Sequence, residues 1–195
     1  QVVLELHTLL TKAQIPKPYI LVGHSLGGVN IRLYAHRYPD EVSGIILVDS
    51  SHEDQEARLP PDPKKYFCFE YPKIAEFFTF MGIHRLMMQA SSMPSKLRLS
   101  NYPDWVQKAY LAKLSSTKCI RTAGKENSAF TESLMQLKNA QFSFGDKLLI
   151  VLTAGKCTNG EEYGLDQEWL NQIYEGWKEL QKELVTQSTK GKQII

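Results

Sequence analysis

Tyr19-Ile20-Leu21-Val22-Gly23-His24-Ser25-Leu26-Gly27-Gly28 is the stretch that decides the predicted fold of this chain. Its first four residues are apolar and lie between Pro18 and Gly23, a pattern typical of a short strand buried on both faces. Residues 26–38 can follow as a helix, which Pro39 ends. Ser25 therefore stands between a strand and a helix, at the centre of a Gly-x-Ser-x-Gly motif.

This motif has a physical requirement that its residues meet. A serine on a sharp turn from strand to helix has a strained backbone, and small residues two positions before and after it let the chain fold back. The hydroxyl of Ser25 is then exposed at the carboxyl end of the sheet. The N–H of Leu26 lies at the helix N-terminus, where unpaired donors favour an oxyanion. We expect Gly27 and Gly28 to let the new helix approach the sheet closely.

The flanking sequence predicts further elements of the same architecture. Apolar residues at helical spacing predict an opening helix over residues 2–13, and residues 44–48 read as a second strand buried on both faces. Residues 147–152 repeat the strand pattern. Asp166 then stands at the N-cap position of a helix that extends to Leu184. Residues 192–195 resemble the beginning of one more strand.

The stretch between the second and third strands has a different character. Six prolines interrupt it, and helical patches such as residues 74–88 and 105–114 lie between them. A structureless loop of that length is improbable, so a helical cap is the better interpretation. We therefore predict an α/β fold, with a parallel sheet flanked by helices. Residues 1–51 and 146–195 form the core, and residues 52–145 form a helical cap or lid.

Composition narrows the possible partners. The chain has 195 residues, is 43% hydrophobic and carries a formal net charge of +2, which gives no reason to expect nucleic acid or an acidic membrane as a partner. No apolar run approaches the ~18 residues of a transmembrane helix. Cys68, Cys119 and Cys157 show neither a disulfide framework nor metal-ligand spacing. With no visible signal peptide, this favours a cytoplasmic protein, although the start at Gln1 leaves a preceding leader open. The oligomeric state is not predicted.

Three stretches together resemble the α/β-hydrolase superfamily, and more narrowly its bacterial-type esterases and uncharacterised hydrolases. They are residues 19–28, residues 34–42 (YAHRYPDEV) and residues 44–52 (GIILVDSSH). The resemblance is close over residues 15–55, weaker over 145–195 and generic in the cap. It implies that the serine turn follows the family's fifth strand and the cap its sixth. A serine nucleophile argues against the haloalkane dehalogenases and epoxide hydrolases that share the fold.

The catalytic histidine that the resemblance implies is not found at the expected position in this sequence. A serine needs a histidine to take its proton, and in this family the order is serine, acid, histidine. All five histidines precede the third predicted strand: His7, His24, His36, His52 and His84. We expect His24 to point away from Ser25, His36 to lie on the surface and His84 to be structural. His24 and His52 are the candidates for the substrate cleft.

Truncation is the simplest explanation of the missing triad histidine. We expect the chain to be an internal segment that is inactive alone. The triad histidine would lie shortly after Ile195, and a loop before Gln1 would supply the second oxyanion donor.

Several carboxylates compete for the role of triad acid. Asp49 directly follows the second strand, where some members of the superfamily place the acid, although most place it after the next strand. Glu161, Glu162 and Asp166 follow that next strand, but helix capping explains Asp166 without catalysis. We prefer Asp49. If Asp49 is not catalytic, we expect it to be a turn residue whose side chain bonds to its own loop.

These residues predict an acyl-transfer enzyme. Ser25 attacks a carboxylic ester or thioester to form an acyl-enzyme, the Leu26 N–H stabilises the oxyanion, and Asp49 orients the histidine. No metal or organic cofactor is implied, and the partner is a small ester-type molecule. The alternatives are a non-catalytic binding protein with a hydrolase fold, and an acyltransferase or C–C hydrolase with the same triad.

The cap contains a group of aromatic and Met residues that could cover an apolar substrate, although we prefer packing between the cap helices. They are Phe67, Phe69, Tyr71, Phe77, Phe78, Phe80, Met81, Met87 and Met88.

Overall fold

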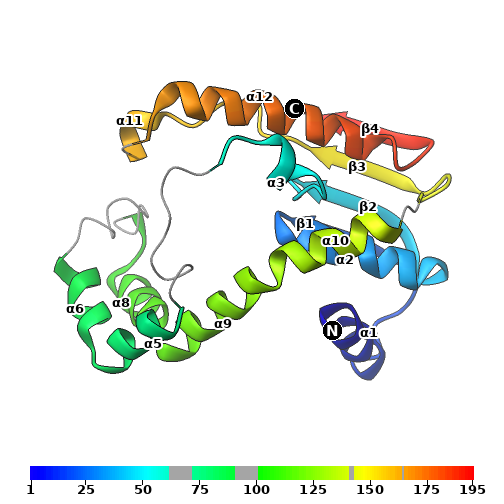
Figure 1. The fold of residues 1–195 in the computed structure, drawn as a ribbon. Helices are drawn as coiled ribbons and strands as arrows, with labels where there is room; N and C mark the ends of the chain where they lie inside the picture. Colours follow the sequence, from blue (N-terminus) through cyan, green and yellow to red (C-terminus); the bar gives the residue numbers. More distant parts are fainter. Residues whose placement is uncertain (62–71, 91–100, 141–142, 164) are drawn as a thin grey trace. The chain divides into compact units, whose positions relative to one another are not determined.

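The computed structural model describes residues 1–61, 72–90, 101–140, 143–163 and 165–195 (Figure 1). The chain divides into two compact units, which are described separately. The first unit comprises Gln1–Pro61, Thr131–Gly160 and Leu165–Ile195. The second comprises Asp62–Phe130 and Glu161–Gly164. The predicted division into core and cap places its boundaries elsewhere, at residues 51/52 and 145/146, and it remains a prediction.

A parallel four-stranded sheet forms the centre of the first unit. Its strands are β1 (Tyr19–His24), β2 (Val42–Val48), β3 (Leu148–Leu152) and β4 (Lys190–Ile194), paired in the order β1-β2-β3-β4. The four strands expected from the sequence all form. Together with the helices around them, they confirm the predicted α/β class.

Helices of the first unit follow the strands in the order expected for parallel crossovers. α2 packs on β1 and β2, α12 packs on β3 and β4, and α1 packs against α2. The bounds of the unit's helical segments are α1 (Val2–Lys12), α2 (Leu26–Arg37), the 3-10 turn η1 (Pro39–Glu41), α3 (Gln55–Arg58), α10 (Phe130–Ala140) and α12 (Gln167–Val185). Asp166 caps α12 by accepting a hydrogen bond from the Trp169 N–H at 2.7 Å, as the sequence predicts.

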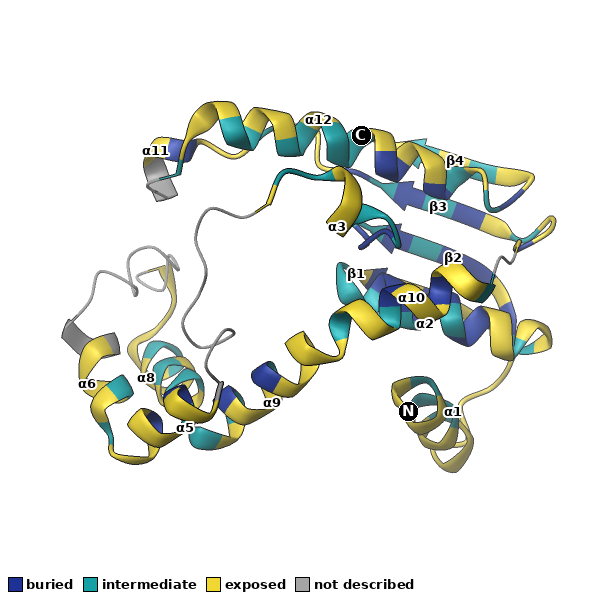
Figure 2. Ribbon diagram, in the orientation of Figure 1, coloured by how far each residue is buried: buried dark blue, intermediate teal, exposed yellow. Residues whose placement is uncertain are grey.

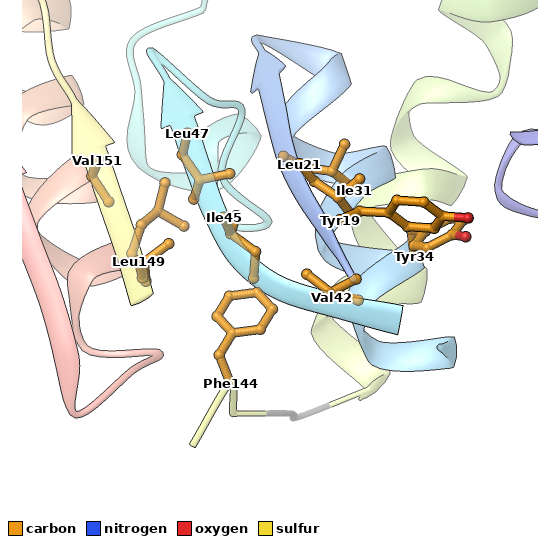
Figure 3. Close-up of a cluster of buried hydrophobic side chains, with 12 residues drawn as sticks. Tyr19, Leu21, Ile31, Tyr34, Val42, Ile45, Leu47, Phe144, Leu149 and Val151 are labelled. Carbon is orange, nitrogen blue, oxygen red and sulfur yellow. The ribbon is translucent and has the colours of Figure 1, made fainter. Parts of the chain in front are cut away.

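The hydrophobic core lies on one face of this sheet. Figure 3 shows Ile45 and Leu47 of β2 between Leu149 and Val151 of β3 on one side and Leu21 of β1 on the other. The strand register explains this arrangement, because Ile45 pairs with both Leu21 and Leu149. Ile31 and Tyr34 of α2, Leu184 of α12 and Phe144 also belong to the cluster.

The expectation that the first strand is buried on both faces is wrong for the described residues. Tyr19 and Leu21 are buried, but Ile20 and Val22 are 63% and 61% exposed. Successive side chains of a strand point to opposite faces, and α2 covers only one of them. In Figure 2, buried residues lie along β2 and β3, whereas α1 is largely exposed and β4 has no buried residue.

The second unit is helical in its described part. It contains α5 (Pro72–Phe80), α6 (Ile83–Ala90), α8 (Asp104–Leu114) and α9 (Thr117–Ser128), while residues 160–163 form the short helix α11 (Gly160–Tyr163). The helical patch predicted over residues 74–88 is divided by Gly82, whose φ of 78° is in the left-handed region that ends helices. None of the described helices has the length and apolarity needed to cross a bilayer.

Packing inside this unit differs from the preferred prediction. α5 packs against α6 and α9, but its buried side chains are Ala75 and Thr79, one helical turn apart. The bulky Phe77, Phe80 and Met81 are more than half exposed. Small residues at the contact surface therefore leave the aromatic residues outside it.

The other members of that predicted group divide between exposed and undescribed positions. Phe78 and Met87 are exposed as well. Phe67, Phe69, Tyr71 and the Met88 side chain lie outside the described residues.

Candidate functional site

The backbone of Ser25 has the strained conformation that the motif requires. Its φ is 52° and its ψ is −123°, and α2 begins at the next residue. Three hydrogen bonds hold this conformation. The Ser25 N–H donates to the Val48 carbonyl at 3.2 Å, and the Ser25 carbonyl accepts from the N–H groups of Gly28 and Ser51, each at 3.0 Å. A positive φ at a non-glycine residue costs about 1–3 kcal/mol, so it persists only when its surroundings determine it in this way.

The side chain of Ser25 is not used to cap the helix that it precedes. A serine at the N-cap normally accepts a hydrogen bond from the second or third helical N–H, but Ser25 makes no such bond. The residue is half-buried. Among the described residues, the Leu26 N–H donates no hydrogen bond that would compete with an incoming anion. A hydroxyl and an adjacent helix-terminal N–H are therefore available at this turn.

Two of the three glycines around Ser25 are required by close contacts. A Cβ on Gly23 would lie 2.6 Å from the Gly27 backbone, so the turn closes only without a side chain there. A Cβ on Gly28 would lie 2.0 Å from the Ser50 Oγ, so at this residue α2 closely approaches the loop that follows β2. A Cβ on Gly27 meets nothing within 4 Å in the described structure, so this glycine does not mediate the approach itself.

Asp49 leaves β2 beside this turn. It follows Val48, whose carbonyl holds Ser25, and it too has a positive φ, of 39°. The Asp49 N–H donates to the Leu152 carbonyl of β3 at 2.8 Å. Its carboxylate oxygen Oδ1 accepts from the Ala154 N–H at 2.9 Å and from the indole Nε1–H of Trp177 at 3.3 Å. The acid is thus held at the carboxyl end of the sheet by two donors from outside its own loop.

The other candidate acids lie on different elements from Asp49. Asp166 uses its carboxylate to cap α12. Glu161 is exposed and belongs to the second unit, and the side chain of Glu162 lies outside the described residues.

Four of the five histidines lie outside the loop that follows β2. His24 is exposed, on the same face of β1 as Ile20 and Val22, and its role in a cleft remains a prediction. His36 is exposed on α2, as expected. His7 stacks on Tyr38 and lies 3.3 Å from Glu41, and His84 belongs to the second unit.

His52 is 4% exposed. Its Nδ1 accepts from the Asp54 N–H at 3.1 Å, and its Nε2 lies 3.7 Å from Glu183. The predicted role in a substrate cleft remains a prediction.

Arg32, which the sequence pattern did not single out, binds the loop that follows Asp49. Fully buried on α2, it donates to both carboxylate oxygens of Glu53, to the Gln187 Oε1 and, at 3.5 Å, to the Ser51 carbonyl. It thereby joins the helix after Ser25 to the loop after Asp49. A signal was present, because Arg32 lies four residues after Gly28 and three before Ala35, both of which are buried on α2.

Two residues of the loop after β2, His52 and Glu53, have side-chain pKa values below their usual values. Burial opposes ionisation of Glu53, but the charge and hydrogen bonds of Arg32 outweigh it and hold the carboxyl pKa below its usual value. Burial is the main cause that lowers the pKa of the His52 imidazole, and the charge of Arg32 lowers it further. The nearby carboxylates raise this pKa, but they do not outweigh the burial. Glu53 is therefore charged and His52 neutral near pH 7, which suits a structural network.

Metal ligands do not converge in the described structure. Among those residues, no group of three His, Cys, Asp or Glu side chains could hold a metal ion. Cys119 and Cys157 are free thiols, and Cys68 lies outside the described residues.

Comparison with known proteins matches this chain to one family. A family model described as the alpha/beta hydrolase fold matches residues 3–176. The uncharacterized protein YqjL of Bacillus subtilis (strain 168) is 25% identical over 171 residues, which are 88% of this chain and 48% of YqjL. The chain therefore spans about half the length of this relative.

Solved structures show the same fold. Cfl2 of Burkholderia cenocepacia superposes with a TM-score of 0.54 at 18% identity, over 89% of this chain and 60% of Cfl2. A Salmonella enterica protein provisionally named an acyltransferase has a TM-score of 0.56 at 15% identity, over 98% of this chain and 60% of that protein.

Two adjacent glycines allow a matched test of the turn. Gly28→Ala should lower the free energy of unfolding by about 1–3 kcal/mol, because its Cβ overlaps Ser50. Gly27→Ala should leave it unchanged or raise it by up to ~1 kcal/mol, since alanine is the better helix former. Urea unfolding measures both, and adding Ser50→Gly to Gly28→Ala should recover part of the loss. Equal effects at the two glycines would contradict the assigned contact.

The buried His52 predicts a pH dependence of stability. The pKa of His52 in the folded state is below its unfolded value of about 6.5. As the pH falls below 6.5, the unfolded state therefore binds a proton that the folded state does not yet bind. The free energy of unfolding should therefore decrease below about pH 6.5, by at most ~1.4 kcal/mol per pH unit for this group. Urea titrations from pH 5 to 8 should show that His52→Gln flattens this slope and that His36→Gln, at an exposed position, does not.

Proposed function

We propose a function from the premise that this chain belongs to the alpha/beta hydrolase fold family. The chain carries the nucleophile part of a serine hydrolase, which cleaves a small carboxylic ester or thioester through an acyl-enzyme on Ser25. The observation that supports this most directly is the backbone of Ser25, held at a φ of 52° between β1 and α2 with its hydroxyl unused as a cap. Strain of this kind is typical of reactive residues.

Formation of the acyl-enzyme uses groups at this turn. The Ser25 Oγ attacks the substrate carbonyl carbon while a histidine takes its proton, and the carbonyl oxygen becomes an oxyanion. The Leu26 N–H, at the positive end of α2, donates to that oxygen. Collapse of the tetrahedral intermediate breaks the bond to the alcohol or thiol, which leaves with the proton from the histidine. Water then repeats the sequence and releases the acid.

Asp49 is the acid that orients this histidine in our proposal. Its Oδ1 accepts two hydrogen bonds, and in the described structure its Oδ2 accepts none, so Oδ2 is available to the imidazole N–H. The histidine itself is proposed to follow Ile195.

The geometry of β4 supports that position for the histidine. The Ile194 carbonyl accepts from the Thr153 N–H, so Ile194 of β4 lies beside the end of β3. Asp49 also leaves β2 there, roughly two strand spacings of about 4.8 Å away.

The nucleophile can be identified with a fluorophosphonate probe, whose phosphorus an activated serine attacks with loss of fluoride. In the whole protein we expect stoichiometric labelling, with the adduct located on the peptide that contains Ser25 by mass spectrometry. Ser25→Ala should abolish labelling, and Ser128→Ala, at an exposed serine of α9, should not change it. Folded protein that stays unlabelled would instead support a binding protein with a hydrolase fold.

Asp49→Asn tests the acid. Hydrolysis of 4-nitrophenyl acetate by the whole protein should slow on the order of 10²–10⁴-fold in kcat, because the amide cannot stabilise the imidazolium. Asp166→Asn is the control: asparagine caps a helix about as well as aspartate, so the bond to the Trp169 N–H should persist and turnover should stay near the original rate. Near-normal turnover in the Asp49→Asn protein would remove this assignment.

A further inference from the structure

We infer that Trp177 is a positioning residue for the proposed triad: its indole N–H fixes the Asp49 carboxylate so that Oδ2 faces the histidine. The inference rests on the proposed function of Asp49. Trp177 lies on α12, and its Nε1–H donates to the Asp49 Oδ1 at 3.3 Å. The Ala154 N–H donates to the same oxygen at 2.9 Å. One oxygen of the acid thus carries both described donors.

Two donors on one oxygen have a geometric consequence. A carboxylate with a single donor can rotate about its Cβ–Cγ bond and exchange its two oxygens. Here a backbone N–H from the end of β3 and a side-chain N–H from α12 approach Oδ1 from separate elements, which fixes the plane of the carboxylate. Orientation of a reacting or orienting group is worth several orders of magnitude in catalysis, so loss of one donor should be measurable in turnover.

The placement of Trp177 is part of a regular pattern on α12. Gln181, one helical turn further along, donates from Nε2 to the Ser50 carbonyl at 2.7 Å. Two successive residues of the loop after β2 are therefore each bound by a donor from successive turns of α12. Leu180 and Leu184, both fully buried, anchor the helix on the sheet, so these donors are supported by a rigid element.

Another tryptophan of the same helix provides a matched control. Trp169 also donates its indole N–H to an oxygen, the Pro61 carbonyl, at 3.0 Å. Trp169→Phe and Trp177→Phe each remove one hydrogen bond from an α12 indole and keep an aromatic ring. Only the second change removes a bond to the proposed acid.

The experiment is a double-mutant cycle in the whole protein, with 4-nitrophenyl acetate hydrolysis and fluorophosphonate labelling of Ser25 as rate measurements. Trp177→Phe should lower kcat about tenfold, with KM changed less than twofold, whereas Trp169→Phe should leave kcat within twofold. In the Asp49→Asn background, Trp177→Phe should have no further effect, because its contribution passes through that carboxylate. A merely structural tryptophan would lower the rate by the same factor in both backgrounds.

The outcomes separate this inference from the proposed function. The inference is overturned if Trp177→Phe leaves kcat unchanged, or if it lowers kcat by the same factor with and without Asp49→Asn. In either case, a labelled Ser25 and a slow Asp49→Asn protein would still support the triad. If Ser25 is not labelled or Asp49→Asn is fully active, the proposed function fails and the inference fails with it. Should Trp177→Phe not fold, replacement of Trp177 by 3-benzothienylalanine removes the N–H at nearly the same volume, and the same tenfold loss is expected.

Discussion

Three backbone hydrogen bonds at Ser25 are the constraint on which the first unit's candidate site depends. They connect the turn to the Val48 carbonyl, to the first turn of α2 and to the Ser51 N–H, so β1, α2 and the exit of β2 are held together at one residue. The positive φ of Ser25 is unfavourable by itself, and it persists because these partners leave no alternative. These contacts involve only backbone atoms of Ser25, and its hydroxyl does not cap α2.

Around this turn, the loop that follows β2 is bound almost residue by residue. Trp177 holds Asp49, Gln181 holds the Ser50 carbonyl and Arg32 holds Glu53, so α2 and α12 both contribute side chains to it. A buried arginine is stable only when its charge is paired, and removal of either partner would leave the other charge uncompensated. This loop is therefore a rigid support beside the nucleophile, and for that reason its first residue is a suitable acid.

Much of this arrangement was predictable because it depends on local pattern. The run from Tyr19 to Val22, the glycines around Ser25 and the cap at Asp166 each carry their physical reason within a few residues. Arg32 and Trp177 were not identified, because their partners are 21 and 128 residues away in the sequence, in Glu53 and Asp49. Helical spacing places both on the inner face of a helix, but it does not specify which polar groups meet them there.

The sequence by itself determined the parallel α/β architecture, the strand-to-helix turn at Ser25 and the positions of its glycines, since each follows from short-range sterics and hydrophobic periodicity. Only the tertiary structure decided that one face of β1 is covered, that Gly28 rather than Gly27 contacts the exit of β2, and that the Asp49 carboxylate is held by an indole from α12. These features depend on which elements pack together, and contacts between residues far apart in the chain are set by the whole fold rather than by local preference.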